Sequence, residues 1–191
     1  MHPWPDIDSL RAGTARQQQA YAALQQLQLL PLLRDFGPVL AGTIPLAVDV
    51  AGSDLDVICE VGPAQQARFR ALLLAHCGQY PGFRWQQLAV RGQASVLCSF
   101  RAAGFDWEIF GQAQPAARQY AVRHLAVEHR VLQLGGEAWR RAVQQLKQQG
   151  LKTEPAFAQL LQLGGDAYEA LLELETWPDE QLRARMAAAR L

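Results

Sequence analysis

Two separate segments of this chain alternate acidic and apolar side chains, and they constrain the fold more than any other feature. The first is Asp54-Leu55-Asp56-Val57, and the second is Phe105-Asp106-Trp107-Glu108-Ile109. Alternation with a period of two is typical of a β-strand that packs one face on a core. Each segment therefore presents two carboxylates on one face of a strand. If the two strands are neighbours, three or four carboxylates converge.

The remaining pattern predicts a mixed α/β fold, with a sheet flanked by helices and a C-terminal helical layer. We assign residues 1–112 to the α/β core and residues 113–191 to a helical region packed on it as one compact unit. The glycine pair Gly135-Gly136 predicts a break in the helical region. We expect a helix that begins at Thr14 and ends near Pro31, a helix over Ala64–Ala75, and strands over Val39–Ala41, Leu55–Val61, Trp85–Val90, Ala94–Arg101 and Phe105–Phe110.

The paired carboxylates predict a metal site. Two like charges this close on a strand repel each other, and the repulsion raises their pKa values unless a cation is present. Hard cations such as Mg²⁺ or Mn²⁺ prefer carboxylate oxygens and commonly share their coordination with substrate phosphates. The structural alternatives are a solvated strand end at Asp54 and Asp56, and an amphipathic edge strand with a wet face at Asp106 and Glu108.

A glycine and two hydroxyl-bearing residues precede the first acidic segment. Gly42-Thr43 is separated from Asp54 by ten residues, and Ser53 stands directly before Asp54. Glycine permits close approach of the backbone to a phosphate, and hydroxyls and amides bind phosphate oxygens. We interpret Gly42, Thr43 and Ser53 as a triphosphate cradle. The alternative is a plain turn.

These motifs together resemble the signature of the DNA polymerase beta-like nucleotidyltransferase superfamily. The matching residues are Ala41-Gly42-Thr43, Asp54-Leu55-Asp56-Val57 and an apolar-acid-apolar strand that both Phe105-Asp106-Trp107 and Trp107-Glu108-Ile109 satisfy. More closely, several runs are similar to an uncharacterised bacterial family catalogued as a domain of unknown function near the nucleotidyltransferases. Those runs are Gly42–Pro45, Gly52–Cys59, Glu108–Gln112 and Lys152–Ala158. Thr43 departs from the superfamily's Ser or Gly but keeps a hydroxyl.

The resemblance implies transfer of a nucleotidyl group from a nucleoside triphosphate to an acceptor. Asp54 and Asp56 would hold Mg²⁺ or Mn²⁺, and Glu108 or Asp106 would be the third acid, of which we favour Glu108. Two other functions stay open. One is pyrophosphoryl transfer of the alarmone-synthetase type, and the other is a non-catalytic nucleotidyltransferase fold that acts as a binding or toxin–antitoxin module.

The helical region supplies candidate cations. Arg123 and Arg130 are seven residues apart and share a helix face, so both are candidates to bind nucleotide phosphates. Lys152 is a third candidate, at the start of a later helix. The alternatives are a solvated helix face for the arginines and a helix cap at Lys152. We expect His124 and His129 to be surface or capping residues.

The composition of the chain indicates which classes of partner molecule are favoured. The 191 residues carry 18 Lys and Arg against 18 Asp and Glu, so no net charge attracts nucleic acid or acidic lipid. A small molecule or a protein side chain is therefore favoured as the acceptor, and a tRNA end is the third possibility. No apolar run is long enough to span a membrane. Three cysteines without C-x-x-C spacing indicate reduced thiols, and we expect a cytoplasmic protein.

Overall fold

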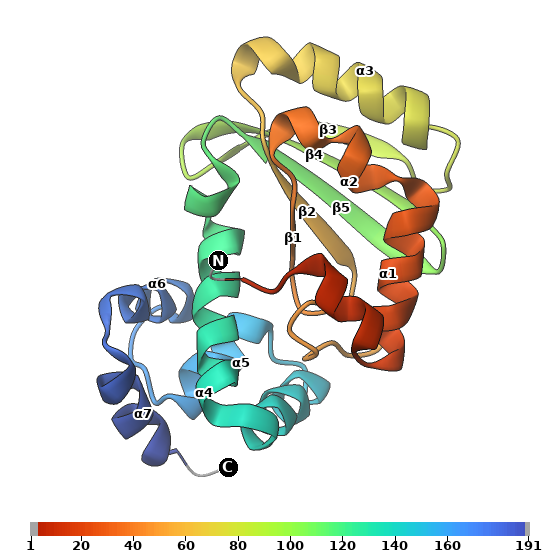
Figure 1. The fold of residues 1–191 in the computed structure, drawn as a ribbon. Coiled ribbons are helices and arrows are strands. Elements are labelled where there is room, and N and C mark those ends of the chain that lie inside the picture. Colours follow the sequence, from red (N-terminus) through yellow and green to blue (C-terminus); the bar gives the residue numbers. More distant parts are fainter. Residues whose placement is uncertain (1–3, 190–191) are drawn as a thin grey trace.

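A five-stranded sheet lies between two groups of helices in the computed structural model, which describes residues 4–189 (Figure 1). The strand order is β1-β2-β5-β4-β3. This architecture confirms the predicted mixed α/β class. The strands are β1 (Val39–Ala41), β2 (Leu55–Glu60), β3 (Arg84–Val90), β4 (Gln93–Ala102) and β5 (Phe105–Gln112).

The central pair of strands determines where the acids lie. Strands β2 and β5 are parallel, whereas the other three neighbouring pairs are antiparallel. Strands β4 and β5 form a hairpin through Ala103 and Gly104, which have φ values of 50° and 80°. Two successive positive φ values match the right-handed twist of the strands that they connect. The strands expected over Ala94–Arg101 and Phe105–Phe110 are therefore joined as a hairpin.

One face of the sheet packs on the N-terminal helices and on α3 (Figure 1). Helix α1 begins with a capping box that Thr14 and Gln17 form, in agreement with the helix start expected at Thr14. It ends earlier than expected, because Gln28 adopts a left-handed conformation with a φ of 50°. The helices on this side are α1 (Ala15–Leu27), α2 (Leu29–Leu32) and α3 (Gln66–Cys77), with 3-10 turns η1 (Ile7–Ala12), η2 (Arg34–Phe36) and η3 (Pro63–Gln65).

The other face, which carries the acids, lies toward the C-terminal helices. Gly136 has a φ of 62° and a ψ of −151°, which are not helical, so the predicted break at Gly135-Gly136 is present as a kink within α4. Among the described residues, no helix is long and apolar enough to cross a bilayer. The elements on this side are η4 (Ala116–Arg118), α4 (Tyr120–Gln148), α5 (Thr153–Leu160), α6 (Ala167–Glu173), η5 (Leu174–Thr176) and α7 (Asp179–Ala187).

Candidate metal and nucleotide site

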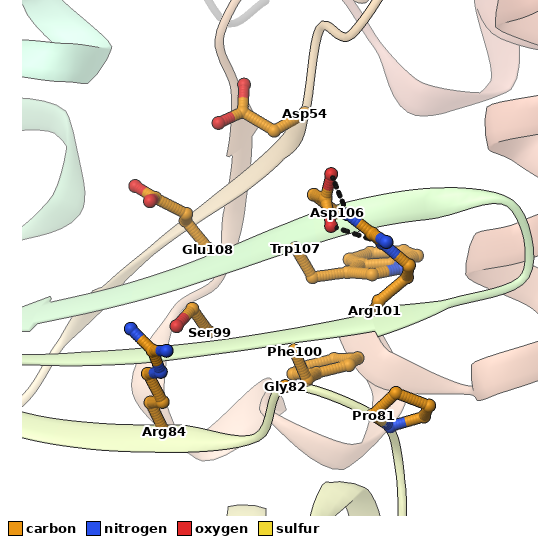
Figure 2. Close-up of a pocket in the computed structure, with 10 residues that line it drawn as sticks. All are labelled: Asp54, Pro81, Gly82, Arg84, Ser99, Phe100, Arg101, Asp106, Trp107 and Glu108. Carbon is orange, nitrogen blue, oxygen red and sulfur yellow. Dashed lines mark hydrogen bonds and ion pairs between the residues drawn. The ribbon is translucent and has the colours of Figure 1, made fainter.

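Three carboxylates converge where β2 begins. One oxygen from each of Asp54, Asp56 and Glu108 lies within 4.8 Å of the others. The parallel register of β2 and β5 sets Asp56 directly beside Glu108, and alternation along the chain puts Asp54 on the same face. Figure 2 shows the Asp54 and Glu108 side chains extending from the same side of the sheet. This acidic triad has the spacing and the oxygen donors that a divalent ion requires.

The triad is electrostatically strained without a cation. Burial raises the pKa of Asp56 to about 7, and the charges of Asp54, Glu108 and Glu154 add to the effect. Burial also raises the pKa of Glu108, again with a contribution from Asp54. A divalent ion would remove the repulsion and favour the ionised forms. The residues present therefore fit a Mg²⁺ or Mn²⁺ ion.

Asp106 lies outside the triad. Its carboxylate accepts two hydrogen bonds from Arg101, at 2.8 Å from Nε and 3.2 Å from Nη2, as Figure 2 shows. These hydrogen bonds hold the pKa of Asp106 below its ordinary value. The register of the sheet explains the difference, since Asp106 pairs with Arg101 on β4, whereas Glu108 pairs with Ser99. Of the two candidates for a third acid, Glu108 is the one that the fold groups with Asp54 and Asp56.

The loop between β1 and β2 brings the proposed cradle to the triad. Gly42 has a φ of 77°, a conformation that glycine adopts without steric cost. The Thr43 hydroxyl donates to the Ser53 Oγ at 3.2 Å, and the Val50 N–H donates to the same oxygen at 3.0 Å. These hydrogen bonds close the loop on itself. Thr43 and Ser53 are therefore neighbours despite the ten residues between them.

The loop is also fixed from outside by three side chains that donate to its carbonyl groups. Gln17, on α1, donates to the Ile44 carbonyl at 2.9 Å. Arg140 and Gln144, beyond the bend in α4, donate to the carbonyls of Leu46 at 3.2 Å and Ala47 at 3.1 Å. Side chains from two helices that satisfy the loop carbonyls make the loop geometry well defined. A preorganised loop is suited to holding a ligand.

A cavity of about 490 Å³ lies between this loop and helices α4 and α5, and we call it the cradle cavity. Gly42, Thr43 and Ser53 line one wall, and Asp54 and Asp56 line its floor. Lys152, an exposed residue at the N-cap position of α5, also lines this cavity, and its contact with a phosphate stays a prediction. The cavity has a volume typical of a site for a small molecule or a nucleotide.

The same cavity contains four ionisable residues that the sequence pattern did not assign to the site, namely His124, Glu128, Lys147 and Glu154. Lys147, Glu128 and His124 line it and are only 9%, 4% and 4% exposed. His124 is therefore buried and not on the surface as expected, because its Nε2 lies 2.9 Å from the Tyr168 carbonyl oxygen, under α6. The sequence contains a signal for the burial of Glu128. Glu128 follows Leu125 by three residues and precedes Leu132 by four, so it belongs to the buried stripe of its helix.

Burial changes the charge balance of the cavity. It lowers the pKa of Lys147, although Glu128, Asp49, Glu154 and Asp54 oppose the effect. It raises the pKa of Glu128 to about 8, with a further contribution from Glu154. The Glu128 Oε1 atom is buried and has no hydrogen-bond partner among the described residues. Such unsatisfied buried groups cost free energy, which a polar ligand in the cavity would recover.

The fold does not bring the two arginines to the cradle cavity. Arg123 forms an ion pair with Glu175 at 2.6 Å, and Arg130 forms one with Asp179 at 2.6 Å. Arg130 also donates to the Leu174 carbonyl at 3.2 Å and to the Trp177 carbonyl. Both guanidinium groups thus connect α4 to the segment around η5 and α7. Neither lines the cradle cavity, so the shared helix face that the sequence predicts serves contacts between helices.

Comparison with known protein families identifies the chain. The family model described as Domain of unknown function (DUF4269) matches residues 22–174, and the chain belongs to this family. No curated protein sequence matches the chain.

Comparison with solved structures shows the fold. The chain is similar to the Cid1 poly(U) polymerase bound to MgATP, with 16% identity and a TM-score of 0.51, over 86% of this chain and 51% of that one. It is also similar to a cytoplasmic RNA terminal U-transferase, with 16% identity and a TM-score of 0.50, over 83% of this chain and 46% of that one. The chain spans about half the length of these structures. The fold is that of nucleotidyltransferases.

Proposed function

We propose that this member of the DUF4269 family is a metal-dependent nucleotidyltransferase. The observation that carries the proposal is the acidic triad Asp54, Asp56 and Glu108, with oxygens within 4.8 Å of one another on a nucleotidyltransferase fold. The cradle cavity beside it supports a nucleoside triphosphate as the donor. The acceptor would be a small molecule, a protein side chain or a tRNA end.

In this proposal the cradle holds the triphosphate. The backbone at Gly42 and the hydroxyls of Thr43 and Ser53 would contact phosphate oxygens. Lys147 and Lys152 would contact the same triphosphate from the helical side of the cavity. Mg²⁺ or Mn²⁺, bound by Asp54, Asp56 and Glu108, would supply charge stabilisation at the phosphates.

The transfer itself exchanges one phosphorus–oxygen bond for another. The acceptor oxygen attacks the α-phosphorus, and the bond from that phosphorus to the bridging oxygen of the β-phosphate breaks. Pyrophosphate leaves with the electron pair. In this proposal Glu108 would also take the proton from the acceptor hydroxyl, because it belongs to the triad that the hydroxyl would approach.

Radioactive labels on two phosphates test the proposal. The protein is incubated with Mg²⁺, a cell extract as the source of acceptor, and ATP, CTP, GTP or UTP labelled at either the α- or the γ-phosphate. Nucleotidyl transfer places the α label in a new product and releases the γ label as pyrophosphate. The Asp54→Asn/Asp56→Asn variant serves as the control and should give no product.

Two other outcomes favour the rival functions. Transfer of the γ label to a product with release of nucleoside monophosphate would indicate pyrophosphoryl transfer. Binding of nucleotide with no labelled product in any extract would favour a non-catalytic or toxin–antitoxin module, which the intact acidic triad argues against.

A further inference from the structure

The sheet face that carries the triad becomes apolar one row beyond it. Ile58 lies two residues after Asp56 on β2, and Phe110 lies two residues after Glu108 on β5. On β4, Leu97 pairs with Phe110 and continues the row. Side chains two residues apart share a face, so this apolar row lies directly beside the acids. Phe110 and Leu97 are only partly buried, so the row leaves apolar surface uncovered.

A second cavity of about 450 Å³ lies over this row, and we call it the sheet-face cavity. The start of α4 covers one side of it. Asp56 and Glu108 form its polar end, and Asp56 also lines the cradle cavity, so the two cavities meet at the triad. The apolar residues of the sheet that line the sheet-face cavity are Ile58, Leu88, Val90, Leu97 and Phe110.

Most of the positive charge at the rim of this cavity is already neutralised. Arg91 pairs with Glu169 at 2.5 Å and lies 3.7 Å from the centre of the Tyr120 ring. Arg123 is paired with Glu175. Arg118, in contrast, has neither an ion pair nor a hydrogen bond from its side chain to any residue that the structure describes. The rim therefore offers one available cation, too little to follow a nucleic-acid backbone.

We propose that the sheet-face cavity holds the acceptor, a small amphipathic hydroxyl compound with a flat apolar body and a single anionic group. This inference rests on the proposed nucleotidyl transfer. In-line displacement requires the attacking hydroxyl to lie opposite the leaving pyrophosphate. Ala41 on β1 pairs with Asp56 on β2, and Asp56 pairs with Glu108 on β5. Glu108 therefore lies on the side of Asp56 away from the cradle.

The chemistry of the cavity defines the acceptor class. The hydroxyl would lie at Glu108, the apolar body would cover Leu97 and Phe110, and the anionic group would lie at Arg118. A volume of about 450 Å³ suits a small molecule and not a helix or a folded RNA. Apolar walls with a few polar groups are typical of sites for such ligands.

Binding of 8-anilinonaphthalene-1-sulfonate, an aromatic compound with one sulfonate, tests the cavity directly. Fluorescence titration of the native protein should show one saturable site, and Leu97→Gln should weaken binding about ten-fold through lost apolar contact. Leu74→Gln is the matched control, because Leu74 is 51% exposed and lies on α3 outside the cavity. Arg118→Gln should weaken binding several-fold and reduce its dependence on salt.

Several results would overturn the inference. The first is that the probe does not bind, and the second is that Leu97→Gln and Leu74→Gln affect probe binding equally. The third is that a 12-nucleotide single-stranded RNA binds more tightly than the probe and that Leu97→Gln abolishes this RNA binding. Dimerisation in sedimentation equilibrium that Leu97→Gln removes would instead assign the surface to a second copy of the chain. Circular dichroism checks that each variant is folded.

The probe and the nucleotide report on separate sites. The Asp54→Asn variant should lose metal-dependent ATP binding and keep probe binding, because Asp54 lines the cradle cavity and not the sheet-face cavity. Loss of the proposed function alone would therefore appear as absent ATP binding with probe binding intact, whereas failure of the acceptor inference would show the reverse.

Discussion

Gly42 and Asp56 are in such close contact that no side chain fits between them. A Cβ atom on Gly42 would lie 2.2 Å from the Oδ2 atom of Asp56. The cradle turn and the carboxylate that we propose to bind the metal are therefore one structural unit. From the sequence, glycine is expected at this position because a phosphate must approach the backbone closely. The structure adds a second reason, which is that a side chain here would displace Asp56.

This contact predicts that Gly42→Ala displaces the Asp56 carboxylate and weakens Mn²⁺ binding by at least about ten-fold, since one ligand of the ion moves. Gly52→Ala is the matched control. Gly52 also has a positive φ, +86°, but a Cβ there meets no atom within 4 Å. Both variants bear the backbone strain, and only Gly42→Ala should lose the metal. Calorimetric titration with Mn²⁺ compares them, and equal affinities would contradict the contact's role.

The Thr43 hydroxyl predicts a difference between two conservative substitutions. Thr43→Ser keeps the hydroxyl and should bind a non-hydrolysable triphosphate like the unaltered protein. Thr43→Val keeps the shape and removes the hydroxyl, so affinity should fall roughly ten- to hundred-fold for a lost hydrogen bond to a charged group. Calorimetric titration measures both. Wild-type affinity in Thr43→Val would reduce the cradle to a structural turn.

The raised pKa of Asp56 predicts a pH-dependent stability in metal-free buffer. The native protein keeps the proton up to pH about 7, whereas the unfolded chain releases it near the ordinary value of 3.8. The free energy of unfolding should therefore fall as pH rises through this window. Asp56→Asn removes the effect, so the variant should become more stable than the unaltered protein by roughly 1–3 kcal/mol at pH 8.

Urea denaturation with EDTA at pH 5, 6, 7 and 8 measures this difference. With Mg²⁺ present the sign reverses, because the ion binds the carboxylate and its affinity should increase as pH rises toward 7. A stability difference between Asp56→Asn and the unaltered protein that stays constant with pH would contradict the assignment.

The third acid is tested by a pair of substitutions on one strand. Glu108→Gln should lower turnover ~10²-fold or more, since Glu108 belongs to the triad and takes the acceptor proton in the proposed mechanism. Asp106→Asn should have a small effect, because Asp106 is exposed and paired with Arg101. Release of labelled pyrophosphate in extract compares the two variants. The opposite ranking would transfer the role to Asp106.

Local alternation along the chain was enough to predict which carboxylates share a face. Asp54 and Asp56 on one strand, and Asp106 and Glu108 on another, follow from the period of two. The choice between Asp106 and Glu108 depends on how β5 is aligned with β2 and β4. That register is set by long-range pairing of segments far apart in the chain, which no local pattern contains.

The helical side of the cavity was harder to predict. A charged residue in an amphipathic helix is usually solvated, and this expectation was wrong for His124 and does not describe Lys147. Lys147 lines the cavity from the part of α4 that follows the kink at Gly136, where the glycine pair predicts a break. The division of the chain at residue 112 stays a prediction.

The most direct test of the central claim is whether the acidic triad binds a nucleoside triphosphate through a divalent ion. Calorimetric titration with α,β-methylene-ATP should show saturable binding in Mg²⁺ and at least about ten-fold weaker binding in EDTA. The Asp54→Asn/Asp56→Asn variant should show the weak affinity in both buffers. Equal affinity with and without Mg²⁺ in the unaltered protein, or unchanged Mg²⁺-dependent binding in the variant, would contradict the account.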